Sequence, residues 1–531
     1  MVTQFIPVIE WELDDTTHCF ALDGTATPST FYQKGVVSIS TISREIPRLC
    51  GLFSIGSVII TFDNSKQVFS KLKAEQPWRG RTLRILYGDA MGSFSNFAPA
   101  YTGVVVDWSF QGDKTTVTVV DNSLDLFNEP VTKTLRRVTA GGYPDAAPSY
   151  SKGELIAYVD GLCQAPVGSV DNGGQLPAYM INESTFVYVA AVGDLSATVE
   201  NVYVYGIKQT ITTDYTISTM TATGGEVYTL FTFTADPRDL VNHTTDETEV
   251  TWSGGSSEQR PIYQLETYLT ERVGVDAAEL DVTTWNTVKA EFDARGYVGT
   301  LVVTKRDLTH GEVVARHLKS NGLQLFRKGD GTWALNFIGL SKTAALALTE
   351  KNITAGTFLQ KSYTSDSLAS RLHVNYDYNY ASPGMEYFQH TPDLISNSEI
   401  TNLGSDIADN LSLWFARSFD GDASTPLSIA ALYLALRRES GIVVECEIPI
   451  ENFNAVDLGD VYTLTHWEGI GVAGFVDTRI VILAIRFIPS AAKSKLVLVG
   501  YVEPDLPSDS PILSATFEIG GGLTVEEVTS A

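Results

Sequence analysis

Alternating apolar and polar residues dominate the first 135 positions of the chain and predict a series of short β-strands. Val, Ile, Leu and Thr are concentrated in four segments, residues 36–40, 56–62, 81–87 and 115–120, and such side chains pack well on a pleated sheet. Gly, Asp and Asn residues typical of turns separate these segments. Closely spaced strands of this kind indicate an N-terminal β-barrel or sandwich over residues 1–135.

A second strand-rich region follows a less regular stretch. Residues 136–180 contain several Gly and Pro residues and an Asp-Asn-Gly-Gly sequence, which predict a connecting loop region. Strand patterns return over residues 181–258, where paired glycines separate them. We expect this part to form a small β-sandwich insertion.

The pattern changes to helical spacing in residues 259–359, which we expect to form an α+β middle domain. One apolar helical face ends at Gly274, a residue type that favours helix C-termini. Thr309 and Glu312 have the spacing of a capping box and predict the start of another helix. A Lys-Gly-Asp-Gly turn at 328–331 joins two apolar segments and predicts a β-hairpin.

The last third of the chain combines a helix with several strands. A Thr-Pro pair at 425–426 suits the start of a helix, Thr as the cap and Pro at the first helical position, and Gly441 suits its end. The next segment alternates between a polar face and an apolar face that includes Cys446. These patterns predict an α+β domain over residues 360–500, followed by a C-terminal arm or tail at residues 501–531.

Length and charge narrow the class of protein. A chain of 531 residues suggests about three to five domains. It carries 63 acidic against 37 basic residues, a net charge of −26, and such a surface repels phosphates and anionic lipids. We therefore expect no sequence-specific nucleic acid partner and no membrane anchor. The acidity fits a channel through which DNA passes without binding and, more simply, a soluble subunit of a large assembly.

The cysteines argue against a metal ribbon or a redox dithiol. Cys19, Cys50, Cys163 and Cys446 are scattered and form no C-x-x-C pair. We expect reduced thiols, with Cys446 acting as a small core residue. The first basic residue is Lys34, so the N-terminus has no secretory signal pattern.

Histidines provide the main test for catalysis. His310 and His317 flank Glu312 but are seven residues apart, which does not match the H-E-x-x-H zinc motif. We expect both on the surface of a helix, and His466, next to Trp467, as a satisfied residue at a strand end. Neither a G-x-S-x-G elbow nor a phosphate-binding loop occurs. We predict no catalytic residue, no cofactor and no metal site, and therefore no enzyme.

One basic cluster remains. Arg79, Arg81 and Arg84 lie beside Trp78, a combination that can stack on single-stranded nucleic acid. We expect these arginines instead to pair with acidic neighbours on an exposed sheet face or at a subunit interface.

The order of these modules resembles the tail-tip hub, or baseplate hub, proteins of tailed bacteriophages and related tail-like particles. In the N-terminal part the resemblance is carried by the segments 59–64, 78–81, 83–88 and 101–105. Further along it is carried by the paired helices, the hairpin at 322–338, the helix before Gly441, the strand through Cys446, the segment 457–466 with its Leu458-Gly459-Asp460 turn, and the strands at 479–485 and 495–499.

The resemblance implies a mainly β, multi-domain fold with α+β modules. Two β-barrel-like tube domains, residues 1–135 and 360–500, would flank a helical and hairpin middle domain that carries the β-sandwich insertion. It further implies a homotrimer that adapts a hexameric tail tube to a trimeric tip and closes the DNA channel until the receptor is engaged. The implied partners are a distal tail protein, the C-terminus of the tape-measure protein and a central tail fibre or tip protein. The implied location is the virion tail tip, assembled in the host cytoplasm.

Two other functions stay open. A distal tail or receptor-binding subunit that binds carbohydrate would use exposed aromatic rings, and Trp252, Tyr203 and Tyr205 are the candidates in the insertion. A cell-wall hydrolase would require a base such as His310 or His466.

Overall fold

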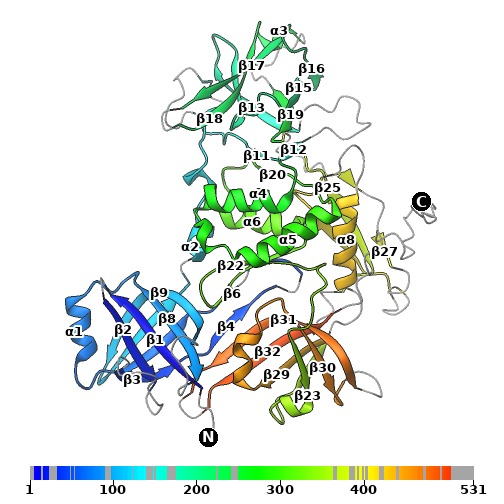
Figure 1. The fold of residues 1–531 in the computed structure, drawn as a ribbon. Coiled ribbons are helices and arrows are strands. Elements are labelled where there is room, and N and C mark those ends of the chain that lie inside the picture. The colour runs from blue at the N-terminus through cyan, green and yellow to red at the C-terminus, as the bar shows by residue number, and fades with distance from the viewer. Residues whose placement is uncertain are drawn as a thin grey trace.

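The computed structural model shows a mainly β protein with a closed barrel, a second curved sheet, a helical module and a β-rich insertion (Figure 1). It describes residues 5–503 apart from 14–15, 23–32, 48, 53, 90–96, 122, 139–146, 149–150, 164–174, 223–224, 241–248, 363–367, 382–388, 391–393, 397–399, 401–404, 418–423, 438–441, 470–473 and 491–492. Gly441 and nearly all of the predicted arm at 501–531 therefore lie outside the described residues.

The N-terminal barrel is closed, and its strands follow the order β1-β2-β3-β7-β10-β9-β8. The four strand segments predicted from the alternating pattern overlap β3, β7, β8 and β10. The strand bounds are β1 (Phe5–Leu13), β2 (Thr16–Leu22), β3 (Gln33–Ile39), β7 (Val58–Asp63), β8 (Thr82–Asp89), β9 (Ala98–Gln111) and β10 (Lys114–Val120).

Aromatic rings fill this barrel. The indoles of Trp11 and Trp108 lie 4.8 Å apart between ring centroids. Helix α1 (Val68–Glu75) packs through Phe69, whose ring lies 4.4 Å from that of Phe62. Because each of these side chains is at most 2% exposed, the barrel is a packed core and not a pore.

The second sheet is curved and open, with strand order β23-β30-β31-β32-β29-β24. It differs from the predicted domain over residues 360–500, because β23 comes from the segment assigned to the middle domain. Moreover, β25 to β28 form a separate small sheet. The bounds are β23 (Leu346–Thr349), β24 (Leu359–Ser362), β29 (Ile442–Ile448), β30 (Val461–His466), β31 (Phe475–Ile488), β32 (Lys495–Val502), and in the small sheet β25 (Arg371–Tyr376), β26 (Gln389–His390), β27 (Leu394–Ile395) and β28 (Ala408–Ser412).

The insertion is a single folded-over sheet, in the order β16-β15-β19-β13-β14-β18-β17. The rings of Phe231 in β18 and Trp252 in β19 pack edge-on with their centroids 6.0 Å apart. Two strands separate β18 from β19 in the sheet order, so the sheet folds over and packs on itself as a sandwich does. The segment 136–180 was predicted as a loop, but strands β11 and β12 and the first part of β13 lie in it. The start of β13 was not recognised because Pro177, inside the strand, weakens its sequence signal. The bounds are β11 (Tyr158–Asp160), β12 (Leu162–Cys163), β13 (Leu176–Asn182), β14 (Val187–Val192), β15 (Val199–Val204), β16 (Ile207–Lys208), β17 (Tyr215–Thr221), β18 (Val227–Phe233), α3 (Pro237–Leu240) and β19 (Val250–Gly255).

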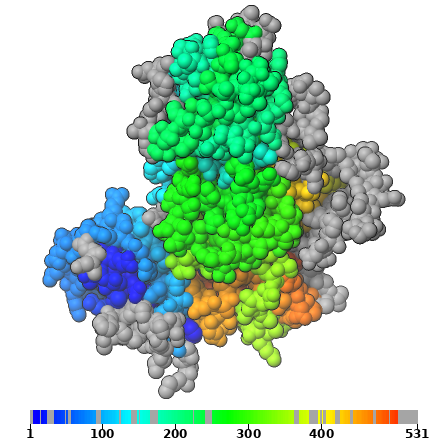
Figure 2. Space-filling view, turned by 45° about the horizontal axis from the view of Figure 1, so that its top comes forward, coloured from blue at the N-terminus to red at the C-terminus, as the bar shows by residue number. Residues whose placement is uncertain are grey.

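The middle module lies between the insertion and the second sheet, with the N-terminal barrel to one side (Figure 2). The predicted capping box is present, since Glu312 N–H donates to Thr309 Oγ1 at 3.2 Å and Thr309 N–H donates to Glu312 Oε2 at 2.7 Å. The predicted stop at Gly274 is also present, with φ of 89°. The bounds are α2 (Ser123–Asn128), α4 (Pro261–Tyr268), α5 (Val282–Arg295), β20 (Leu301–Val303), α6 (His310–Ser320), β21 (Leu323–Arg327), β22 (Trp333–Phe337) and α8 (Ser424–Leu436).

The Thr-Pro pair does not cap its helix as predicted. Helix α8 begins at Ser424, one residue earlier, so Thr425 lies inside its first turn. The Thr425 hydroxyl instead accepts a hydrogen bond from Val298 N–H at 3.2 Å. Most of α8 is buried, and its first turn is therefore held by tertiary contacts.

The prediction that His310 and His317 lie on the surface is wrong, because both are 0% exposed. His310 Nδ1 lies 2.9 Å from Tyr268 Oη and its Nε2 lies 3.2 Å from Thr134 Oγ1. His317 Nε2–H donates to the Pro261 carbonyl at 2.9 Å. Their helix α6 packs between other elements, so positions that look peripheral on one helix are core positions in the module.

Burial gives His317 a pH-dependent effect on stability. It lowers the pKa of His317 to about 4 from the usual 6.5, so the unfolded state takes up the proton first as the pH falls. We expect the free energy of unfolding to drop by about 1.4 kcal/mol per pH unit for this group between pH 6.5 and 4. Urea unfolding at pH 7 and pH 5 measures the drop.

His317→Gln should remove that part of the pH dependence and leave the parts due to His310 and His18, whose pKa values burial also lowers. His18→Gln is the matched control, since His18 is only half-buried. Equal pH slopes for the native protein and His317→Gln would contradict the account.

Candidate functional site at the junction of the barrels

The reactive side chains that the sequence offers as candidates, His466 and the cysteines among them, take part in packing. His466 ends β30, stacks on Phe358 with ring centroids 3.9 Å apart, and accepts a hydrogen bond at Nδ1 from Glu468 N–H at 3.1 Å. This is the satisfied strand-end histidine that was predicted. Cys446 is 0% exposed, as expected for a core residue, and all four thiols are free of disulfides.

Within the described ranges, no group of three or more His, Cys, Asp or Glu residues is placed to hold a metal ion. No helix among those same residues is both long and apolar enough to cross a membrane.

Arg84, Trp78 and Trp252, three of the basic and aromatic candidates, also make contacts within the chain. Arg84 pairs with Glu12 at 3.3 Å on the exposed barrel surface, as predicted for this residue, whereas Arg81 Nε–H donates to the Pro77 carbonyl at 3.1 Å. Trp78 packs edge-on against Trp108 with ring centroids 5.6 Å apart. In the insertion, Trp252 is 0% exposed and its Nε1–H donates to the Pro177 carbonyl at 3.3 Å. Trp252 therefore presents no face on which a sugar could stack.

The feature that joins distant parts of the chain is a short strand that leaves the N-terminal barrel. Strand β4 (Ile42–Glu45) pairs antiparallel with β31 of the second sheet, from Ile42 opposite Phe487 to Glu45 opposite Ala484. Ile46 N–H extends the ladder to the Leu483 carbonyl at 2.9 Å. The segment therefore belongs to the second sheet (Figure 1).

The chain then contacts the middle module before it returns to the barrel. Strand β6 (Ser54–Ile55) pairs with β4, and β5 (Gly51–Leu52) pairs parallel with β21. Strand β7 then resumes the barrel. The segment 42–55 thus ties three modules together through backbone hydrogen bonds.

An ion pair between a buried arginine and a partly exposed aspartate reinforces β4. Arg44 is 5% exposed, and its guanidinium lies 2.9 Å from Asp457 Oδ1. Asp457 precedes the Leu458-Gly459-Asp460 turn, whose Gly459 N–H donates to the Ile482 carbonyl at 2.9 Å. The turn is therefore anchored to β31, the strand with which β4 pairs.

The tip of the β21–β22 hairpin is inserted against the N-terminal barrel. Thr102 Oγ1 of β9 donates to the Gly329 carbonyl at 3.1 Å. A Cβ at Gly329 would lie 2.1 Å from the Pro99 carbonyl oxygen, so only glycine fits there. Arg327 forms a buried ion pair with Asp121 at 2.6 Å, which joins the hairpin to the end of β10.

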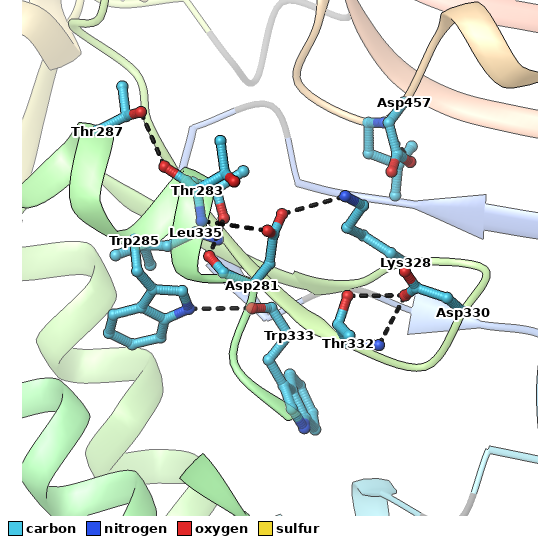
Figure 3. Close-up of polar contacts among 12 residues, drawn as sticks. Asp281, Thr283, Trp285, Thr287, Lys328, Asp330, Thr332, Trp333, Leu335 and Asp457 are labelled. Carbon is cyan, nitrogen blue, oxygen red and sulfur yellow. Dashed lines mark hydrogen bonds and ion pairs between the residues drawn. The ribbon is translucent and has the colours of Figure 1, made fainter. Parts of the chain in front are cut away.

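The opposite side of the hairpin tip faces helix α5 and the second sheet (Figure 3). Lys328 Nζ donates to Asp281 Oδ2 at 3.1 Å, and Asp281 is also the N-cap of α5. Burial opposes the charge on Lys328, but the hydrogen bond to Asp281 and the charges of Asp281, Asp457 and Asp330 raise its pKa overall. The cation at the tip therefore interacts with a carboxylate of its own turn and with carboxylates from two distant segments.

Aromatic packing completes the junction. The ring of Tyr87 in β8 lies 4.7 Å from that of Phe487 in β31 and 5.7 Å from that of Phe453. The barrel and the second sheet thus share an apolar contact as well as a strand. Together these contacts hold two β-structures in one fixed relation.

The sequence predicted the hairpin turn and the Leu-Gly-Asp turn. It did not predict that Lys328 of the hairpin turn interacts with Asp457, which precedes the Leu-Gly-Asp turn. It missed β4, Arg44 and the Arg327–Asp121 pair. Two signals were present, an Arg that alternates with Ile42 and Ile46 in a short segment and a Gly within a turn of charged residues. Neither signal names the partner, because the partners lie hundreds of residues away.

No family model and no curated protein matches this chain. Among solved structures, it is similar to a 43 kDa tail protein of prophage MuSo2 from Shewanella oneidensis, with a TM-score of 0.42, 12% identity, and coverage of 94% of this chain and 98% of that chain. A tail protein from Neisseria meningitidis gives a TM-score of 0.40 and 8% identity over 93% of this chain and 96% of its own.

An E. coli type VI secretion component, described as similar to tail proteins of bacteriophage T4, gives a TM-score of 0.35 and 8% identity over 89% of this chain and 75% of its own. All three TM-scores lie below 0.5, so the support for a function comes from the geometry of this chain.

Gly329→Ala should loosen the junction, because the added methyl group would overlap the Pro99 carbonyl. We expect a loss of about 1–3 kcal/mol in the free energy of unfolding, measured by urea denaturation. Gly56→Ala is the control, since a Cβ there meets nothing within 4 Å, and it should change stability by less than about 0.5 kcal/mol. Equal effects of the two substitutions would refute the close approach.

Asp121→Ala should leave the Arg327 guanidinium buried without its carboxylate. Removing one partner of a buried pair costs about 3–5 kcal/mol, whereas an exposed pair is worth less than about 1 kcal/mol. Glu12→Ala, which breaks the exposed pair with Arg84, is therefore the matched control. If both variants lose the same small amount in calorimetry, the Arg327 pair does not hold the hairpin.

Proposed function

We propose that this chain is the hub of a bacteriophage tail tip or baseplate. The observation that carries the proposal is the strand β4, which fixes a closed barrel and a second curved sheet side by side at one end of the molecule (Figure 1). Three copies would contribute six such β-structures to a ring. A trimer of this kind can therefore match a hexameric tube above it and a threefold tip below it.

The rigidity of the junction suits this role. A ring closes only when each subunit presents its interfaces at a constant angle. Backbone pairing at β4, the Arg44–Asp457 pair and the inserted hairpin tip all resist a change in the angle between the two β-structures. We infer that the barrel and the second sheet alternate around the tail axis.

The remaining parts of the proposal follow from the hub position. The partners would be a distal tail protein above, the C-terminus of the tape-measure protein inside and a central fibre or tip protein below. The ring would close the DNA channel until receptor engagement, in the tail tip of a virion assembled in the host cytoplasm. The net charge of −26 suits a channel from which DNA must be released. The role is structural and requires no enzymatic step.

The number of copies in the purified complex tests this proposal. We expect native mass spectrometry to give three copies. Six copies would favour a distal-tail ring, and a monomer that binds carbohydrate would favour a receptor-binding subunit.

Substitutions at Arg44 and Arg84 compare the contribution of a junction ion pair to trimer formation with that of a surface ion pair. Arg44→Ala removes the pair with Asp457 and should weaken trimer formation by about tenfold or more, since about 1.4 kcal/mol corresponds to a factor of ten. Arg84→Ala removes an exposed pair within the barrel and should leave the copy number unchanged. Equal association of the two variants would count against a role for the junction in assembly.

A further inference from the structure

Strand β24 lies at one edge of the second sheet. Within the described residues β24 pairs only with β29. Leu359, Gln360 and Lys361 are all exposed. An unpaired edge presents backbone N–H and C=O groups that can bind another strand.

Apolar side chains lie beside this edge. Phe358, directly before β24, stacks on His466 with ring centroids 3.9 Å apart, and His466 stacks on Trp467 at 6.1 Å. Trp467 is 68% exposed. This row of rings ends in solvent and leaves one side of a large indole uncovered.

The two faces of the edge differ. Gln360 lies opposite Val444, a buried core residue, so Phe358 and Gln360 belong to the inner face. Leu359 and Lys361 lie opposite Glu445 and Val443 and belong to the outer face. A strand that fits here would present apolar residues inward and polar residues outward.

The segment that follows the second sheet has this pattern. Prolines at 504, 507 and 511 precede it, three glycines at 520–522 follow it, and it contains no Lys or Arg. Such boundaries are typical of a strand. In an extended segment 512–519, alternation would place Leu513, Ala515, Phe517 and Ile519 on one face and Ile512, Ser514, Thr516 and Glu518 on the other.

The segment begins close enough to reach the edge. Tyr501 of β32 lies opposite Val443 of β29, which lies opposite Lys361 of β24. Three inter-strand steps then separate β32 from a new strand outside β24, a distance of about 14 Å. Residues 504–511 can span up to about 26 Å when extended. Because β24 and β32 are both antiparallel to β29, a chain that turns back would run antiparallel to β24.

We propose that residues 512–519 add to β24 of the same copy as an antiparallel edge strand. Leu513 and Phe517 cover the inner face beside Phe358 and Trp467, and Glu518 lies on the outer face with Lys361. The arm thereby blocks an edge that would otherwise pair with another chain. This inference depends on the second sheet and not on the hub function.

Truncation after Glu503 tests the pairing by hydrogen–deuterium exchange. We expect amides in residues 359–362 to exchange at least about tenfold faster in the truncated chain, with little change in β10. Trp467 emission, obtained as the difference from Trp467→Phe, should shift to longer wavelength. Phe517→Ser should reproduce both effects, whereas Thr516→Ser, on the outer face, should not. Unchanged exchange at β24 would overturn the proposal.

Disulfide trapping tests which face of the added strand points outward and whether the strand comes from the same copy of the chain. Lys361→Cys combined in turn with Ser514→Cys, Thr516→Cys or Glu518→Cys should give a bond within one chain for at least one pair, since all lie on the outer face. Lys361→Cys with Phe517→Cys places the thiols on opposite faces and should give none. Bonds between chains would overturn the same-copy assignment, and bonds with Phe517→Cys would overturn the orientation.

Discussion

The relation between the N-terminal barrel and the second sheet depends on the pairing of β4 with β31. Without it, the two β-structures would meet through side chains alone, and such contacts between modules permit relative motion. Because β4 enters the second sheet and the chain then returns to the barrel through β7, the barrel cannot rotate without breaking backbone hydrogen bonds. The middle module depends on the same segment, since β5 adds to its hairpin.

The charged groups at the junction determine how the segments are arranged more than they add to stability. Arg44, Arg327 and Lys328 each meet a carboxylate from a remote segment. Burying such pairs adds little net stability, but breaking one is costly, so the pairs exclude arrangements in which the partners are apart. The glycine at 329 acts similarly, because it permits an approach that no other residue allows. The junction is therefore defined by a few contacts that tolerate little change.

Local structure was largely predictable from the sequence, and contacts between distant segments were not. Strand alternation in the barrel, the capping box of Thr309 and Glu312 and the stop at Gly274 depend on neighbours within a few residues. Helix α5 escaped prediction because only Trp285, Val288 and Phe292 are buried along it. The signals that remained for α5 were its N-cap Asp281 and the left-handed Gly296. The burial of His310 and His317 and the pairing of β4 depend on what packs against them, which no local pattern encodes.

A three-dimensional reconstruction of the assembled complex by electron cryo-microscopy would test the central claim most directly. The account predicts a ring of six β-structures from three chains, in which closed barrels alternate with second sheets and β4 bridges the two that belong to one chain. A ring of six identical barrels, or a complex in which the barrel and second sheet of one chain are not neighbours, would contradict it.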